Sequence, residues 1–482
     1  MKKHSFYIVI SIIALFLISS CTDNHAHHKA KYVFLFIGDG MGQAQVNLAE
    51  AYQAAVDHKK GFEHFGFTEF PAAGFASTYA NNRFITGSAA SGTALATGHK
   101  TNINRISMDP EGKQPFKTIA EKFKESGMKI GILTSVSIDH ATPAVFYAHQ
   151  SLRSMYFEIG NDLVNSSFDF FGGGGFKSPE GEINGQPVNL IEKAKENGFR
   201  YVNNMDDFLA LNKETGRVIA VPNPVTESGA MNYVIDMEQN EVRLGDLTAK
   251  AIEMLDNENG FFMMVEGGKI DWACHSDDAA TSIHETIDFA GAIDKAVAFY
   301  EEHPDETLIV VTADHETGGL SLGNGPTKYK TYFRLLQYQK ISEEKFTELV
   351  GEFRQNLSGD VNADFDRMMN VIKEKFGLGD PDKIPLKDED TQKLKEAFVT
   401  SMYPSEGEGA DMTYTKYEPL ASTVIKMMSD KAGVGWTTHA HTGVNVPVYA
   451  IGVGAEHFSS YIDNTDIPKI MEEVIMDGAH HH

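Results

Sequence analysis

Short hydrophobic runs alternate with amphipathic stretches over roughly the first two thirds of the chain. Continuous β-prone runs occupy residues 32–37, 130–136, 168–171, 261–265 and 308–311. Such runs are typical of strands buried on both faces of a sheet. Hydrophobic positions three or four residues apart predict helices at residues 116–126 and 283–303. This alternation predicts an α/β three-layer sandwich, in which a large, mostly parallel central sheet is flanked by helices.

The pattern changes after about residue 322. Residues 340–400 are highly charged and helix-prone, and glycine and proline interrupt them. Strand character returns at residues 446–453, which read VPVYAIGV. We therefore predict one domain over residues 31–482 with a mostly helical insertion at about 322–430, which would form a lid, a dimerisation crown or a specificity element on the sheet.

Polar residues with metal-binding side chains follow the hydrophobic runs. They are Asp39, His140, Thr142, Glu266, Asp271, His275, Asp314, His315 and, in a last set, His441. Ligands of open α/β sheets gather beyond the carboxyl ends of the strands, so these side chains should converge on one crevice. Asp271 and His275 are four residues apart and would share one face of a helix, a pairing that suits zinc. The sequence thus predicts a multi-metal site, and such sites usually perform hydrolysis or phosphoryl transfer.

Ser88 begins an alanine-rich stretch that ends at Thr97 and Gly98, which predicts a helix with a glycine stop. Backbone N–H groups and the helix dipole favour an anion at such a start. A serine there can be a nucleophile activated by a metal. The alternative is an ordinary helix N-cap, the commoner role for serine. The predicted metal cluster favours the nucleophile.

Composition limits the partners. The chain has 482 residues, 42% of them hydrophobic and 23% charged, which is enough to bury a large core. The net charge of −25 argues against nucleic acid as a specific partner bound to a basic face. An anionic substrate must then be attracted locally, by metals and arginine.

The amino terminus resembles a bacterial lipoprotein signal. Lys2 and Lys3 precede an apolar run over residues 6–18, and Cys21 follows two serines. We predict a signal peptide over residues 1–20, a lipid on Cys21 and a polar tether over residues 21–30, so that the protein is exported as a periplasmic or cell-envelope lipoprotein. The alternative is an ordinary signal peptide in which Cys21 is incidental. Removing Cys21 leaves only Cys274, so no intrachain disulfide is possible.

Six ordered motifs resemble those of the alkaline phosphatase family. They are IGDGMG at 37–42, TGSAASGTA at 86–94, HATPA at 140–144, VEGGKIDWACH at 265–275, TADHETGG at 312–319 and HAHTG at 439–443. The resemblance covers residues 31 to about 454, apart from the predicted insertion. It implies hydrolysis of small phosphomonoesters through a phosphoserine at Ser88, and a homodimer.

The resemblance also implies the cofactors, two Zn²⁺ and one Mg²⁺. The implied ligands are Asp271, His275 and His441 for the first zinc, Asp39, Asp314 and His315 for the second, and Asp39, Glu266 and Thr142 for the magnesium. Arg153 lies where the family has an arginine that clamps phosphate, and a guanidinium can hold two phosphoryl oxygens at once.

Three positions depart from the best-known bacterial pattern. His140 stands where many bacterial members have aspartate, Trp272 where they have lysine, and Gly87 where aspartate is common. An imidazole at position 140 would allow zinc in the third site. Two alternative functions stay open at this stage: a phosphodiesterase of the same superfamily and a non-catalytic zinc-binding lipoprotein.

Overall fold

The computed structural model describes residues 29–403 and 418–476. The predicted signal peptide, Cys21, all but the last two residues of the tether, and His480 to His482 lie outside these residues. None of the described helices combines the length and hydrophobicity that a bilayer span requires. The structure contains one chain, so the predicted homodimer stays a prediction.

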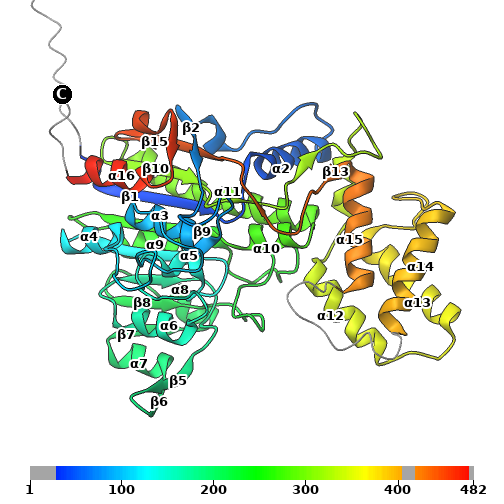
Figure 1. The fold of residues 1–482 in the computed structure, drawn as a ribbon, viewed down its shortest axis with the longest axis horizontal. Coiled ribbons are helices and arrows are strands. Elements are labelled where there is room, and N and C mark those ends of the chain that lie inside the picture. The colour runs from blue at the N-terminus through cyan, green and yellow to red at the C-terminus, as the bar shows by residue number, and fades with distance from the viewer. Residues whose placement is uncertain (1–28, 404–417, 477–482) are drawn as a thin grey trace, which may run out of the picture.

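A sheet of ten strands among the described residues forms the centre of the fold (Figure 1). In spatial order the strands are β16 (Tyr461–Asp463), β2 (Ala72–Ser77), β15 (Val446–Gly452), β10 (Thr307–Thr312), β1 (Tyr32–Gly38), β9 (Phe261–Gly267), β3 (Lys129–Thr134), β4 (Phe170–Gly172), β8 (Arg217–Ala220) and β7 (Phe199–Val202). Only β15 is antiparallel to its neighbours in this sheet. The predicted mostly parallel sheet is confirmed, and the run at 446–453 is its antiparallel member.

Helices cover both faces of the sheet, as the three-layer prediction requires. The helices α2 (Gln43–Val56) and α9 (Leu244–Leu255) pack against α11 (Ala279–Glu302), while α4 (Ile119–Glu125), α5 (Ala141–Ala144) and α16 (Asp466–Met476) pack around α3 (Ser88–Thr97). Phe261 contacts Phe299 of α11, whereas its neighbour Phe262 contacts Phe123 of α4. Successive strand side chains point to opposite faces, so these two helix groups lie on opposite sides.

The charged segment after residue 322 is helical. It contains the 3₁₀ helix η2 (Phe333–Tyr338) and the α-helices α12 (Glu343–Arg354), α13 (Val361–Phe376), α14 (Asp388–Met402) and α15 (Pro419–Ala432). The short strands β12 (Ser321–Leu322) and β13 (Val434–Gly435) pair where the segment leaves and rejoins the main body. In Figure 1 helices α12 to α15 lie together at the right, beside the sheet and its flanking helices. Whether the segment acts as a lid or crown stays a prediction.

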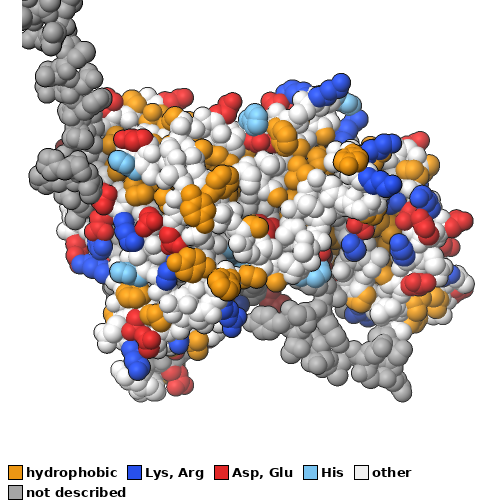
Figure 2. Space-filling model, turned by 45° about the horizontal axis from the view of Figure 1, so that its top comes forward, with side chains coloured by type: hydrophobic (Ala, Val, Ile, Leu, Met, Phe, Trp, Pro, Cys, Tyr) orange, Lys and Arg blue, Asp and Glu red, His pale blue; other side chains and the backbone are white. Residues whose placement is uncertain are grey.

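The remaining elements connect the sheet or carry the site. They are η1 (Gly66–Glu69), α6 (Tyr156–Asn165), β5 (Glu180–Ile183), β6 (Gln186–Asn189), α7 (Leu190–Glu196), α8 (Met205–Leu209), α10 (Lys269–His275), β11 (Glu316–Thr317), β14 (His441–Thr442) and η3 (Ala455–Phe458). Figure 2 shows acidic, basic and hydrophobic side chains interspersed over one face of the molecule.

Candidate metal centre and nucleophile

Three parallel strands end at the same edge of the sheet and deliver carboxylates there. In β1, Ile37 is level with Glu266 of β9 and with Thr312 of β10. Asp39 and Asp314 follow within two residues of those positions. All three carboxylates are buried. The sequence prediction that the strand ends bring these acids together therefore matches the geometry.

The first cluster contains Asp271, His275 and His441. Asp271 Oδ2 lies 3.3 Å from His275 Nε2, and the Nε2 atoms of His275 and His441 are 3.2 Å apart. The Nδ1 atom of His275 is 2.6 Å from the carbonyl oxygen of His439, and that of His441 is 2.9 Å from the carbonyl oxygen of Thr86. Each carbonyl can only accept, so Nδ1 donates in both rings, and in the neutral form of each ring the Nε2 lone pair faces the cluster.

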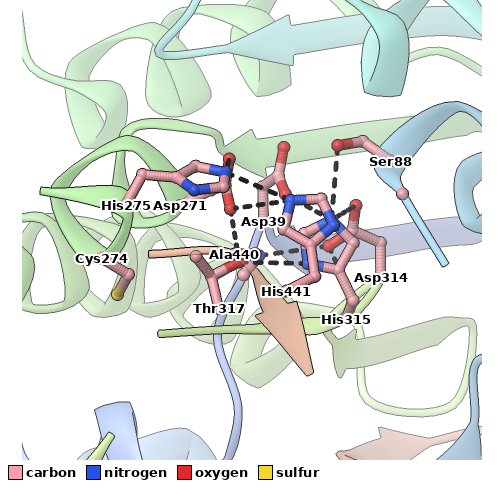
Figure 3. Close-up of polar contacts among 12 residues, drawn as sticks. Asp39, Ser88, Asp271, Cys274, His275, Asp314, His315, Thr317, Ala440 and His441 are labelled. Carbon is pink, nitrogen blue, oxygen red and sulfur yellow. Dashed lines mark hydrogen bonds and ion pairs between the residues drawn. The ribbon is translucent and has the colours of Figure 1, made fainter. Parts of the chain in front are cut away.

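The second cluster surrounds His315. Its Nε2 atom lies 3.4 Å from Asp39 Oδ1, 3.3 Å from Asp314 Oδ2 and 3.4 Å from Ser88 Oγ (Figure 3). Asp271 also reaches this cluster, because ligand atoms of Asp39, Asp271 and His315 lie within 4.8 Å of one another. The two clusters are therefore contiguous and share Asp271, in keeping with the predicted convergence on one crevice.

A third group joins Asp39 to Glu266 and His140, whose ligand atoms also lie within 4.8 Å of one another. Thr142 Oγ1 donates to Asp39 Oδ2 over 3.4 Å. Arg153 Nη2 donates to His140 Nε2 over 2.9 Å. Thus Arg153, which the sequence placed at the phosphate, contacts the imidazole of the third group in this structure.

Burial of so many acids in one place raises their pKa values. Desolvation first, and then the charges of Asp314, Asp271 and Glu266, raise the pKa of Asp39 well above its ordinary value. The same burial raises the pKa of Glu266 to about 7 and that of Asp314 to about 8. Uncharged acids at neutral pH are poor ligands, but a bound cation would stabilise their ionised forms.

The histidines differ in charge. Burial opposes the charged form of His275, but the Asp271 carboxylate raises the pKa of His275 to about 9. Burial, the His275 charge and the Arg153 charge instead hold the pKa of His315 well below its usual range, and burial with Arg153 does the same for His140. Neutral imidazole is the form that coordinates a metal.

The residues present fit bound divalent cations. Among the described residues, Asp39 Oδ1, Glu266 Oε1 and Asp314 Oδ2 are buried oxygens without a hydrogen-bond partner. Leaving such groups unpaired is costly, and a cation would supply the missing interaction. The mixture of carboxylate oxygens and imidazole nitrogens in the first two clusters suits zinc, and the oxygen-rich third group suits a harder cation.

Ser88 is the first residue of α3 and is buried beside the second cluster. Gly87 precedes it in an extended conformation, so Gly87 is the N-cap and makes no side-chain cap hydrogen bond. Ser88 is therefore at the helix start but not in the N-cap position. Its hydroxyl faces the His315 ring, as Figure 3 shows, and this position suits a nucleophile better than a cap.

The contacts of two other motif residues, Cys274 and Thr317, could not be predicted from the motifs. Cys274 is buried and contacts Ser282 and Gln45, and its sulfur points away from the clusters in Figure 3. Burial raises the pKa of its thiol, which disfavours the thiolate form that binds metals. Thr317 contacts both Asp271 and His315, although the sequence reading gave it no role. Its position two residues after His315, within the TADHETGG motif, was the available signal.

Comparison with known proteins identifies similar chains. A family model described as alkaline phosphatase matches residues 30–476. Alkaline phosphatase 3 of Bacillus subtilis is 32% identical over 452 residues, which cover 92% of this chain and 88% of that relative. Alkaline phosphatase 4 of the same organism is 30% identical over 461 residues, 93% of this chain and 90% of the relative.

The solved structures that resemble this chain also include alkaline phosphatases. A cold-active alkaline phosphatase from a psychrophilic Shewanella species superposes with a TM-score of 0.77 at 29% identity, covering 92% of this chain and 99% of that one. A variant of TAB5 alkaline phosphatase with Mg bound in its M3 site has a TM-score of 0.63 at 25% identity, covering 93% and 98% of the two chains.

Proposed function

Since this chain belongs to the alkaline phosphatase family, we propose that it hydrolyses phosphate monoesters through a phosphoserine intermediate at Ser88. The family is one of metal-dependent phosphomonoesterases, and the chain is accordingly a phosphoric monoester hydrolase. The observation that carries the finer proposal is the Ser88 hydroxyl, 3.4 Å from the His315 ring nitrogen and at the start of α3.

The proposed ligands are those of the three groups described above. Asp271, His275 and His441 would hold one zinc, and Asp39, Asp314 and His315 a second. Glu266, Thr142 and Asp39 would hold a magnesium, or a zinc if His140 also binds. When bound, the cations would supply Lewis acidity and charge neutralisation for phosphoryl transfer.

The chain's own groups would then perform the transfer. Ser88 Oγ loses its proton and forms a bond to phosphorus while the bond from phosphorus to the alcohol oxygen breaks, which leaves phosphoserine and a free alcohol after protonation. Water then adds to the phosphoserine, and the bond from Oγ to phosphorus breaks to release inorganic phosphate. Backbone N–H groups at the start of α3 favour the negative charge of the phosphoryl group throughout.

Arg153 is proposed to bind the non-bridging phosphoryl oxygens. Its guanidinium lies beside His140, and its charge acts on Asp39, His275 and His315. The Arg153 charge thus acts on residues of all three groups of the site. A guanidinium there would bind a monoester dianion more strongly than a diester monoanion.

The test compares p-nitrophenyl phosphate with bis(p-nitrophenyl) phosphate in the wild type and in Arg153→Ala. We expect the wild type to prefer the monoester, and the variant to lose roughly 10- to 100-fold in monoester kcat/KM, because hydrogen bonds to a charged group are lost. Diester kcat/KM should fall less. A wild type that prefers the diester, with Arg153→Ala affecting both esters equally, would instead support the phosphodiesterase.

We also propose that Cys21 carries a lipid and that the protein is held at the bacterial cell envelope. The polar composition of residues 21–30 suits a tether between this lipid and β1. In cells that express Cys21→Ser, we expect phosphatase activity to move from the membrane fraction to the soluble fraction with unchanged kcat, because Cys21 is not one of the proposed site residues. Equal membrane retention of the variant and wild type would contradict the anchor.

A further inference from the structure

One buried hydroxyl joins the two histidine clusters. Thr317 Oγ1 lies 2.5 Å from Asp271 Oδ1 and 3.3 Å from His315 Nδ1, and all three side chains are buried. Asp271 belongs to the first cluster and His315 to the second. Figure 3 shows Thr317 between them, on the side of His315 away from Ser88.

The directions of these two hydrogen bonds follow from their partners. A carboxylate oxygen accepts hydrogen bonds, and the Thr317 hydroxyl donates to Asp271 Oδ1. The single Thr317 hydroxyl proton therefore goes to Asp271, and its lone pair accepts from His315 Nδ1. This places the His315 ring proton on Nδ1. The Nε2 lone pair is then left facing Asp39, Asp314 and Ser88.

The backbone around Thr317 leaves its hydroxyl little freedom. Thr317 stands opposite His441 in the pairing of β11 with β14, and its N–H donates to the Gly40 carbonyl over 3.1 Å. Its own carbonyl accepts from Gln45 Nε2 over 2.9 Å. A Cβ atom on Gly40, whose φ is +71°, would lie only 2.9 Å from Thr317 Oγ1. The residue is thus fixed against segments that carry Asp39 and His441.

The side chain of Glu316, the residue before Thr317, stabilises the same pairing of β11 with β14. It accepts from Gln45 Nε2, from the N–H groups of Gly319 and Leu320, and from Thr442 Oγ1. These bonds fix the turn after β11 and the strand that carries His441. The partners of Glu316 are thus the side chains of Gln45 and Thr442 and two backbone groups, whereas Thr317 contacts two candidate ligand side chains.

We propose that Thr317 is a positioning residue that sets the placement of the two zinc clusters relative to each other and selects the Nδ1-protonated form of His315. This role for Thr317 rests on the proposed metal-dependent function, which supplies the identity of the cations. Hydrogen-bond partners of this kind typically change metal affinity by about 10- to 100-fold when they are removed.

The decisive substitution is Thr317→Val, which keeps the shape of the side chain and removes its hydroxyl. Asp271 Oδ1 then loses its donor and His315 Nδ1 its acceptor. We expect zinc affinity, measured on chelator-stripped protein by competition with a chromophoric chelator and without substrate, to fall about 10- to 100-fold. With saturating zinc, kcat should fall and KM for p-nitrophenyl phosphate should stay close to the wild-type value.

Thr317→Ser is the rescue variant, because it restores the hydroxyl without the methyl group, and its zinc affinity should approach the wild-type value. Thr248→Val is the matched control, because Thr248 is equally buried and its Oγ1 donates to the Leu244 carbonyl over 2.8 Å within α9. It should lose some stability but no zinc affinity.

Wild-type zinc affinity in Thr317→Val would overturn the proposal, and so would a Thr317→Ser variant as defective as Thr317→Val. The zinc titration needs no turnover. If the proposed phosphatase activity failed while this titration gave the expected pattern, the positioning role would stand without the proposed reaction.

Discussion

Replacing Ser88 with alanine is expected to reduce phosphate release by about a thousand-fold or more, because the change removes the only protein atom proposed to bond to phosphorus. The substitution deletes one oxygen at the start of α3 and keeps a good helix former there. Metal binding should persist, because the proposed zinc ligands are other residues. The loss should therefore appear in kcat rather than in zinc content.

The measurement is acid-quench trapping with a ³²P-labelled monoester, followed by peptide mapping. Wild-type protein should yield a labelled peptide that contains Ser88, and Ser88→Ala should yield none. Ser91→Ala is the matched control. Ser91 is buried in the same helix, but its hydroxyl donates to the Asp314 carbonyl over 2.5 Å. That variant should still form the labelled intermediate. Turnover near the wild-type rate in Ser88→Ala would remove the serine from the mechanism.

Removal of divalent cations should abolish activity and make the stability of the fold decrease as pH rises. In the folded, metal-free chain the pKa values of Glu266 and Asp314 are about 7 and about 8, above their unfolded values near 4. Between about pH 4 and about pH 8 these two acids therefore bind more protons in the folded state than in the unfolded state, so their contribution to the free energy of unfolding decreases with rising pH.

His275 acts in the same direction. Its folded pKa of about 9 exceeds the unfolded value near 6.5, so its stabilising contribution is complete below about pH 6.5 and is lost as pH rises through about 9. Bound cations would oppose these effects, because they stabilise the ionised acids and coordinate neutral imidazole. The increase in melting temperature on metal addition should therefore grow between about pH 5 and about pH 8.

Differential scanning calorimetry of EDTA-stripped protein, with and without zinc and magnesium, would measure this increase. We expect it to reach about 5 °C or more at pH 8, with recovery of activity in the same samples. Asp39→Asn should make the metal-free protein more stable than the wild type at that pH, because one buried acid is gone. The same variant should lose the response to metal. A metal-independent melting temperature and activity would show that the clusters are not metal sites.

The sequence alone determined the fold class and most of the proposed site, for a physical reason. Hydrophobic runs such as those of β1, β9 and β10 are buried on both faces, and a chain with such strands and intervening helices forms a mostly parallel sheet. Residues at or just after the ends of those strands must then meet at one edge, as Asp39, Glu266 and Asp314 do. The helical spacing of Asp271 and His275 likewise follows from local geometry.

Only the tertiary structure decided how the clusters are connected. Asp271 reaches both clusters, Arg153 donates to His140, and Thr317 contacts Asp271 and His315. The contact of Arg153 with His140 joins residues 13 positions apart and that of Thr317 with Asp271 residues 46 positions apart, and both depend on how α10, β11 and the loop with Arg153 pack together. Local periodicity contains no information on such distances, since it reports which face of an element is buried and not which polar atoms meet across elements.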